Sequence, residues 1–153
     1  MLVNVKQKAP DFSLLNQNNE KVQLKDLNTK LILFFYPKDN TPGCTKEAIS
    51  FSKNKKTINN LGYHIFGISK DSIKKHQNFI EKQSLTVELL SDENKKTCEE
   101  YGVWVEKSMY GRKYFGIERT TFLINEKQII TKIWRKVKVT NHVEDVISYI
   151  ENS

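Results

Sequence analysis

Residues 31–48 read LILFFYPKDNTPGCTKEA, and this stretch decides the fold. Its first six residues, Leu31 to Tyr36, are apolar without a break, which is typical of a strand covered by helices on both faces. Pro37 ends the strand because proline has no N–H to donate to a neighbouring strand. Apolar residues then recur at helical spacing from Ala48 onward. The stretch therefore predicts a central strand, a polar loop and a helix start.

Outward from this stretch, short apolar runs alternate with helical patterns. Residues 11–15 and 21–24 flank the Asn-rich turn NQNNE and predict an N-terminal hairpin. The other expected elements are a helix over 48–61, a strand over 63–69, a helix over 71–83, an apolar segment at 89–90, a short helix within 91–102, a hairpin of 120–124 and 128–134, and a helix over 143–150. Gly62 is expected to end the first of these helices, and a capping box of Asn141 and Glu144 to begin the last. This order predicts a single α/β domain over residues 1–153, with a mainly parallel central sheet, antiparallel edges and flanking helices.

The composition fits a soluble, cytoplasmic protein. Hydrophobic residues make up 38% and charged residues 28% of the 153 positions. No run approaches the roughly 18–20 apolar residues of a membrane span, and the first residues lack a secretory signal. Two cysteines are too few for a secreted disulfide scaffold. We therefore expect a cytoplasmic protein without a membrane partner.

The net charge is +7, yet the basic residues are spread along the chain. Most lie in helical segments opposite the apolar positions, and no nucleic-acid motif accompanies them, so we interpret them as solvated faces rather than a nucleic-acid site. His64, His76 and His142 lack the spacing of metal ligands, and no CxxC pair occurs. We expect neither a metal nor another cofactor.

Cys44 falls just beyond the central strand, in the first turn of the following helix. Open α/β sheets place ligands at the carboxyl ends of their strands, and a helix start stabilises a thiolate through its free N–H groups. Pro42 and Gly43 suit a helix start at which the backbone comes close to the sulfur. A lone cysteine is more often a small buried hydrophobe. The polar surroundings favour a reactive thiol.

The segment PKDNTPGCTKEA resembles the active site of peroxiredoxins of the bacterioferritin comigratory protein, or peroxiredoxin Q, type. Pro37, Thr41 and Cys44 match the family spacing P-x-x-x-T-x-x-C. The resemblance continues through GISKDSIKKHQNF, LLSDENKK, YGVW and MYGRKYFGIERTTFLI, in which Arg119 occupies the position of the family's active-site arginine. It implies a thioredoxin fold with an extra N-terminal hairpin and a thiol-dependent peroxidase activity on hydrogen peroxide and organic hydroperoxides.

The resemblance also implies a role for each matching residue. Cys44 would attack the peroxide and become a sulfenic acid. Arg119 would keep the thiolate charged and donate toward the peroxide oxygens. The hydroxyl of Thr41 would accept from the peroxide and donate to the thiolate. Pro37 would shield the sulfenic acid from water and fix the loop.

The chain departs from many relatives in lacking a resolving cysteine at the usual positions, which are here Ile49 and Ile80. The other thiol is Cys98, in KKTCEEYGV. Three interpretations are open. The protein is a one-cysteine enzyme that thioredoxin, glutaredoxin or glutathione regenerates, or Cys44 forms an unusual disulfide with Cys98, or a disulfide joins two chains. Tyr101 lies one helical turn from Cys98, which favours simple packing. We expect a monomeric one-cysteine enzyme.

Two other functions remain open from the sequence. A thioredoxin-fold binding or chaperone-like protein without turnover would use the basic surface on an acidic partner, but the complete set Pro37, Thr41, Cys44 and Arg119 argues against it. A disulfide oxidoreductase is disfavoured because no CxxC occurs.

Overall fold

The elements alternate between strands and helices along most of the chain. A computed structural model describes residues 3–153. Its strands are β1 (Ser13–Asn16), β2 (Lys21–Gln23), β3 (Lys30–Phe35), β4 (Tyr63–Ser69), β5 (Glu88–Ser91), β6 (Trp104–Met109), β7 (Arg112–Ile117), β8 (Thr120–Ile124) and β9 (Ile130–Trp134). Its helices are the 3-10 helix η1 (Leu24–Asp26) and the α-helices α1 (Pro42–Lys53), α2 (Lys55–Asn60), α3 (Ile73–Gln83), α4 (Lys96–Glu100) and α5 (His142–Glu151).

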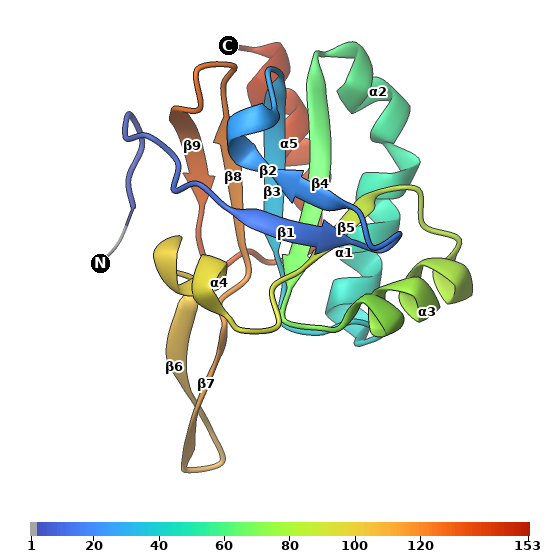
Figure 1. The fold of residues 1–153 in the computed structure, drawn as a ribbon, viewed down its shortest axis with the longest axis vertical. Coiled ribbons are helices and arrows are strands. Elements are labelled where there is room, and N and C mark those ends of the chain that lie inside the picture. Colours follow the sequence, from blue (N-terminus) through green and yellow to red (C-terminus); the bar gives the residue numbers. More distant parts are fainter. Residues whose placement is uncertain (1–2) are drawn as a thin grey trace.

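Seven strands form one mixed sheet in the order β2-β1-β5-β4-β3-β8-β9. β3 lies inside it next to the central β4, parallel to β4 and antiparallel to β8, so that Leu33 is opposite Phe66 on one side and Phe122 on the other. β5 is parallel to β4, whereas β1, β2 and β9 join in antiparallel fashion. The predicted α/β fold, with its mixed sheet and N-terminal hairpin, is confirmed (Figure 1).

The side chains of β3 alternate between two cores on opposite faces of the sheet. Leu31, Leu33 and Phe35 belong to one cluster, which η1, α4 and the N-terminal segment cover. Ile32 and Phe34 belong to the other cluster, beneath α1, α2, α3 and α5 (Figure 1). All five side chains are almost completely buried. Because helices cover both faces, the whole strand has to be apolar.

Three local predictions were wrong or incomplete. The single helix expected to run to Leu61, with Cys44 in its first turn, begins at Pro42 but breaks at Asn54 into α1 and α2, and Gly62, with φ +93°, follows it as expected. The capping box at Asn141 does not form because this residue has a left-handed φ of +62° and its side chain makes no capping bond. Residues 104–117 form a separate hairpin, β6–β7, that the pattern did not predict.

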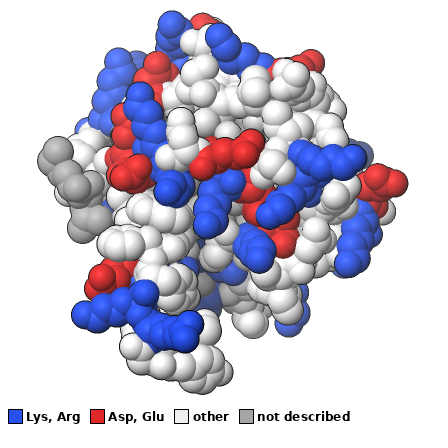
Figure 2. All heavy atoms as spheres, turned by 60° about the horizontal axis from the view of Figure 1, so that its bottom comes forward, with Lys and Arg blue, Asp and Glu red and all other residues white. Residues whose placement is uncertain are grey.

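The surface carries both signs of charge. Figure 2, in which the bottom of the Figure 1 view comes forward, shows Lys and Arg side chains interspersed with Asp and Glu. Within residues 3–153 no helix is long and apolar enough to cross a membrane.

Candidate active site

Cys44 lies at the third position of α1, directly after the loop that leaves the central strand. Pro42 occupies the first position of this helix, where its missing N–H costs no hydrogen bond. The Cys44 side chain is 1% exposed and packs with the core beneath α1. The expected position in the first turn is therefore confirmed, in a setting where unpaired N–H groups favour a negative charge.

Arg119 brings a positive charge to this thiol from the segment between β7 and β8. Its Nη2 lies 3.3 Å from the Cys44 sulfur, and its Nη1 donates to Glu47 Oε1 at 2.8 Å. Burial opposes the charge of Arg119, but Glu47 and Cys44 outweigh it and raise the pKa of the guanidinium. Gly43 makes room for it, because a Cβ there would lie 3.1 Å from Nη2. The structure thus joins two residues that the sequence placed 75 positions apart.

Glu47 is a member of the site that sequence analysis missed. Its side chain is fully buried one helical turn after Cys44, and its Oε2 has no hydrogen-bond partner among the described residues 3–153. Burial raises the pKa of Glu47 to about 7, although Arg119 works in the opposite direction. The i, i+3 spacing from Cys44 was the available signal, since such residues share a helix face. Arg119 is therefore shared between a thiol and a carboxyl group that titrates near neutral pH.

Thr41 and Pro37 lie in the loop between β3 and α1. Thr41 precedes α1 with extended backbone, and its hydroxyl donates to the Lys38 carbonyl oxygen at 2.8 Å instead of capping the helix. Pro37 is half-buried and follows the buried Tyr36. Both residues therefore belong to the loop that delivers Cys44 to the helix start.

A buried polar network ties this loop to α3 and β5. Asp39 Oδ2 lies 2.7 Å from His76 Nδ1, and Asp39 Oδ1 accepts from the Tyr36 hydroxyl at 2.6 Å. His76 Nε2 lies 3.0 Å from the Leu90 carbonyl oxygen. A carbonyl only accepts, so Nε2 carries a proton, and a second proton is shared between Nδ1 and Asp39. His76 and Asp39 thus form a buried hydrogen-bonded pair that holds the loop.

The same network has the dimensions of a metal site. Ligand atoms of Asp39, Asp71 and His76 lie within 4.8 Å of one another. Asp71 Oδ2, however, accepts from the Asp39 N–H at 2.9 Å and from the Ser69 hydroxyl at 2.7 Å. With the His76 ring paired as well, the cluster is explained by its own hydrogen bonds. The sequence indicates this cluster only through His76, which lies on the apolar face of α3, three residues from both Ile73 and Phe79.

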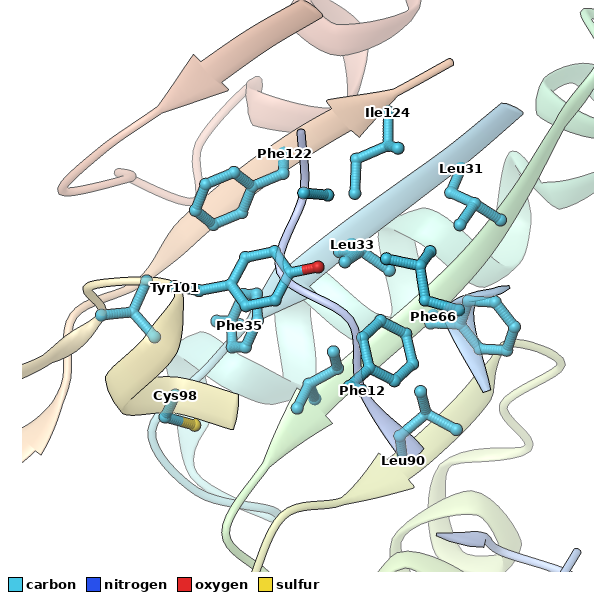
Figure 3. Close-up of a cluster of buried hydrophobic side chains, with 14 of the residues drawn as sticks. Phe12, Leu31, Leu33, Phe35, Phe66, Leu90, Cys98, Tyr101, Phe122 and Ile124 are labelled. Atoms are coloured by element: carbon cyan, nitrogen blue, oxygen red, sulfur yellow. The ribbon is translucent and has the colours of Figure 1, made fainter. Parts of the chain in front are cut away.

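Cys98 lies on the other face of the sheet from Cys44. It is completely buried in α4, in the cluster that contains Phe35 and Tyr101 (Figure 3). Burial, with the charge of Asp92 next, raises the pKa of this thiol, which favours the unreactive protonated form. Both cysteines are free thiols. The structure therefore does not bring Cys98 to the site of Cys44.

A helix-start thiol beside an arginine, at the end of the central strand of this sheet, defines a thiol-based redox enzyme of the thioredoxin fold. The AhpC/TSA family model matches residues 5–133. A putative peroxiredoxin bcp of Coxiella burnetii is 51% identical over 148 residues, which are 96% of this chain and 98% of the relative. Peroxiredoxin Bcp of Bacillus subtilis is 42% identical over 153 residues, covering 99% and 98% of the two chains.

Solved structures agree with the sequence relatives. The bacterioferritin comigratory protein of Xanthomonas campestris superimposes with a TM-score of 0.90 at 34% identity, over 97% of this chain and 98% of that one. A PrxQ of Xylella fastidiosa gives a TM-score of 0.93 at 34% identity, over 99% and 98%. The chain belongs to the AhpC/TSA family, as a peroxiredoxin of the Bcp or PrxQ type. Its activity is that of a thiol peroxidase.

Proposed function

We propose that Cys44 is the peroxidatic cysteine and that it works without a resolving cysteine in the same chain. The thiolate attacks one oxygen of hydrogen peroxide or of an organic hydroperoxide. An S–O bond forms, the O–O bond breaks, and Cys44 becomes a sulfenic acid. The displaced hydroxide or alkoxide takes a proton and leaves as water or alcohol. The 3.3 Å separation of Arg119 Nη2 and the Cys44 sulfur is the observation on which this proposal rests.

Arg119, Thr41 and Pro37 assist this step. Arg119 stabilises the thiolate and then donates to the oxygens on which negative charge grows. Thr41 has hydrogen-bonding capacity left for a peroxide, because its hydroxyl donates its proton to the Lys38 carbonyl oxygen and its own oxygen can still accept. Pro37 limits the access of water at the loop. These roles follow the family motif, and the common location at the start of α1 supports them.

The absence of a nearby second thiol supports the one-cysteine cycle. Ile49 and Ile80 stand where many relatives carry the resolving cysteine. Cys98 is buried on the opposite face of the sheet, so an internal disulfide would require large rearrangement of α1 or α4. An external thiol of thioredoxin, glutaredoxin or glutathione then attacks the sulfenic acid and releases water. A second thiol breaks the mixed disulfide and restores Cys44.

The same proposal includes the setting of the enzyme. We infer one domain over residues 1–153, a monomer and a cytoplasmic location. The continuous central sheet from β2 to β9 supports one domain. The two free thiols fit a reducing compartment.

Two matched cysteine variants test the proposal. With peroxide and each of the three thiol reductants, Cys44→Ser should lose all turnover, because no thiolate remains at the site. Cys98→Ala should keep turnover within about twofold of the wild type, since burial separates it from the chemistry. Turnover in Cys44→Ser would refute the role of Cys44. Loss of turnover in a folded Cys98→Ala would refute the one-cysteine cycle.

A further inference from the structure

Exposed apolar side chains are concentrated on the hairpin β6–β7. Among residues 3–153, the large hydrophobic side chains that are exposed are Val5, Leu15, Met109, Tyr110, Tyr114, Phe115 and Tyr149. Four of these seven lie within the 14 residues of the hairpin, and Tyr110 at its tip is 98% exposed. Single exposed apolar residues need no explanation, but a group of them indicates an interaction site.

The hairpin stands apart from the rest of the fold. Within residues 3–153, β6 and β7 pair only with each other, from Trp104 opposite Ile117 to Met109 opposite Arg112. Figure 1 shows this ribbon projecting from the body of the molecule beyond α4. A two-stranded ribbon is only marginally stable in water. Its exposed aromatic side chains therefore suit a surface that a partner covers, and Tyr, Phe, Met and Arg are residues enriched in such interfaces.

The base of the hairpin adjoins the candidate active site. β7 ends at Ile117, two residues before Arg119. The Lys107 ammonium group donates to the Ile117 carbonyl oxygen. Burial and then the charge of Arg119 lower the pKa of Lys107, so the two cations are close enough to interact. A protein that lies along the hairpin would consequently reach the surface over Arg119 and the start of α1, beneath which Cys44 lies.

Basic residues surround this approach. On the hairpin, Lys107, Arg112 and Lys113 outnumber Glu106. Lys38 and Lys46 are exposed on either side of the α1 start. Lys136 and Lys138 are exposed beside Val137, whose N–H donates to the Arg119 carbonyl oxygen at 2.9 Å. On the lobe at the bottom of Figure 2, Lys and Arg cover more of the surface than Asp and Glu and lie next to uncharged side chains. A partner with an acidic surface fits this rim.

We propose that the hairpin is the docking arm for an acidic dithiol protein of the thioredoxin or glutaredoxin kind, which reduces oxidised Cys44. The inference rests on the proposed one-cysteine cycle. One thiolate of the partner attacks the sulfenic sulfur, forms the mixed disulfide and releases the oxygen as water. The second thiol of the partner takes over that disulfide and frees the Cys44 thiolate. A second copy of this chain is a poorer occupant, because each copy carries a net charge of +7.

Two hairpin variants separate the apolar and the charged contribution. Tyr110→Ser/Phe115→Ser removes the exposed rings, and Arg112→Glu/Lys113→Glu reverses the charge. Leu15→Ser/Lys21→Glu is the matched control, because these two residues are cross-strand neighbours on the N-terminal hairpin and both are exposed. Turnover is measured at saturating peroxide against the concentration of an acidic bacterial thioredoxin or glutaredoxin, recycled by NADPH and its reductase. Dithiothreitol replaces the protein in a parallel series.

Each hairpin variant should lower the rate constant for reduction by the protein at least about tenfold, whereas the control variant stays near the wild type. Reduction by dithiothreitol and oxidation by peroxide should not change, which also shows that the variants are folded. Unchanged reduction by the protein overturns the inference. The inference is also overturned if only dithiothreitol reduces the wild type. It is overturned as well if the wild type sediments as a dimer and the hairpin variants sediment as monomers. If peroxide does not oxidise Cys44 at all, the proposed function itself fails.

Discussion

Arg119 Nη2 lies 3.3 Å from the sulfur of Cys44, and the other terminal nitrogen of the same guanidinium donates to Glu47 at 2.8 Å. One planar fork therefore serves two acidic groups on consecutive turns of α1. A point charge such as a lysine ammonium cannot reproduce both contacts in this geometry.

Arg119→Lys should slow the reaction of Cys44 with hydrogen peroxide by roughly 10²-fold, because one preorganised donor is lost where charge develops. The second-order rate constant can be measured by competition with a peroxidase of known rate. Arg135→Lys is the control, since Arg135 donates to the Val3 carbonyl oxygen, whereas the hydrogen bonds to Cys44 and Glu47 come from Arg119. A rate for Arg119→Lys equal to that of the control would show that the guanidinium has no part in the step.

Thr41→Val should lower the same rate constant by about tenfold, and Thr41→Ser should restore most of it. Valine keeps the shape but lacks the hydroxyl that holds Lys38 and that we propose meets the peroxide. The comparison of the two variants isolates the hydroxyl from the packing of the loop. Equal rates for valine and serine would argue against a hydrogen-bonding role.

Glu47→Gln should change how stability depends on pH. The pKa of Glu47 is about 7 in the folded protein, compared with 4.5 for an ordinary glutamate, which we take for the unfolded chain. Between these values the folded state holds a proton that the unfolded state has released. The free energy of unfolding therefore falls as pH rises through this window, by about 3 kcal/mol in total from this group.

Urea unfolding of wild type and Glu47→Gln from pH 4.5 to pH 8 measures this difference. The wild type should lose about 3 kcal/mol more than the variant over that range. Parallel pH curves for the two proteins would mean that Glu47 ionises as an ordinary carboxyl group.

His76→Leu should destabilise the fold by about 1–3 kcal/mol, because it leaves the buried Asp39 carboxyl group without its hydrogen-bonding partner on α3. The double variant Asp39→Asn/His76→Leu should recover part of this loss, since no buried carboxyl group without its partner remains. Denaturant unfolding gives all the free energies needed for the cycle. If the stability loss of the double variant equals the sum of the losses of Asp39→Asn and His76→Leu, the two residues are not coupled.

The central strand and the helix-start thiol were predictable because local patterns determine them. An unbroken apolar run, a proline and a following helical pattern placed Cys44 in its first turn, as found. The resemblance identified Arg119, although no local signal shows that it meets Cys44. The pairing of Asp39 with His76 depends on how α3 packs against the loop, and a 37-residue separation hides that from the sequence.

The hairpin of residues 104–117 was missed for a physical reason. Its two-residue turn, Tyr110 and Gly111, has φ values of +53° and +79°, as a type I′ turn requires. Asparagine or aspartate usually precedes the glycine in such turns, so Tyr-Gly gave no turn signal. Its strands pack little against the core and show no apolar alternation. The hairpin was therefore missed because neither its turn residues nor the pattern of its strands indicates it in the sequence.

Intact-mass measurement after one equivalent of hydrogen peroxide, under non-reducing conditions and with a sulfenic-acid trap, tests the central claim most directly. The account predicts a single trap adduct on Cys44 in a monomer, with Cys98 unmodified. Loss of two hydrogens without an adduct would join Cys44 to Cys98, and a disulfide-linked dimer would join two chains. Either result would contradict the one-cysteine cycle.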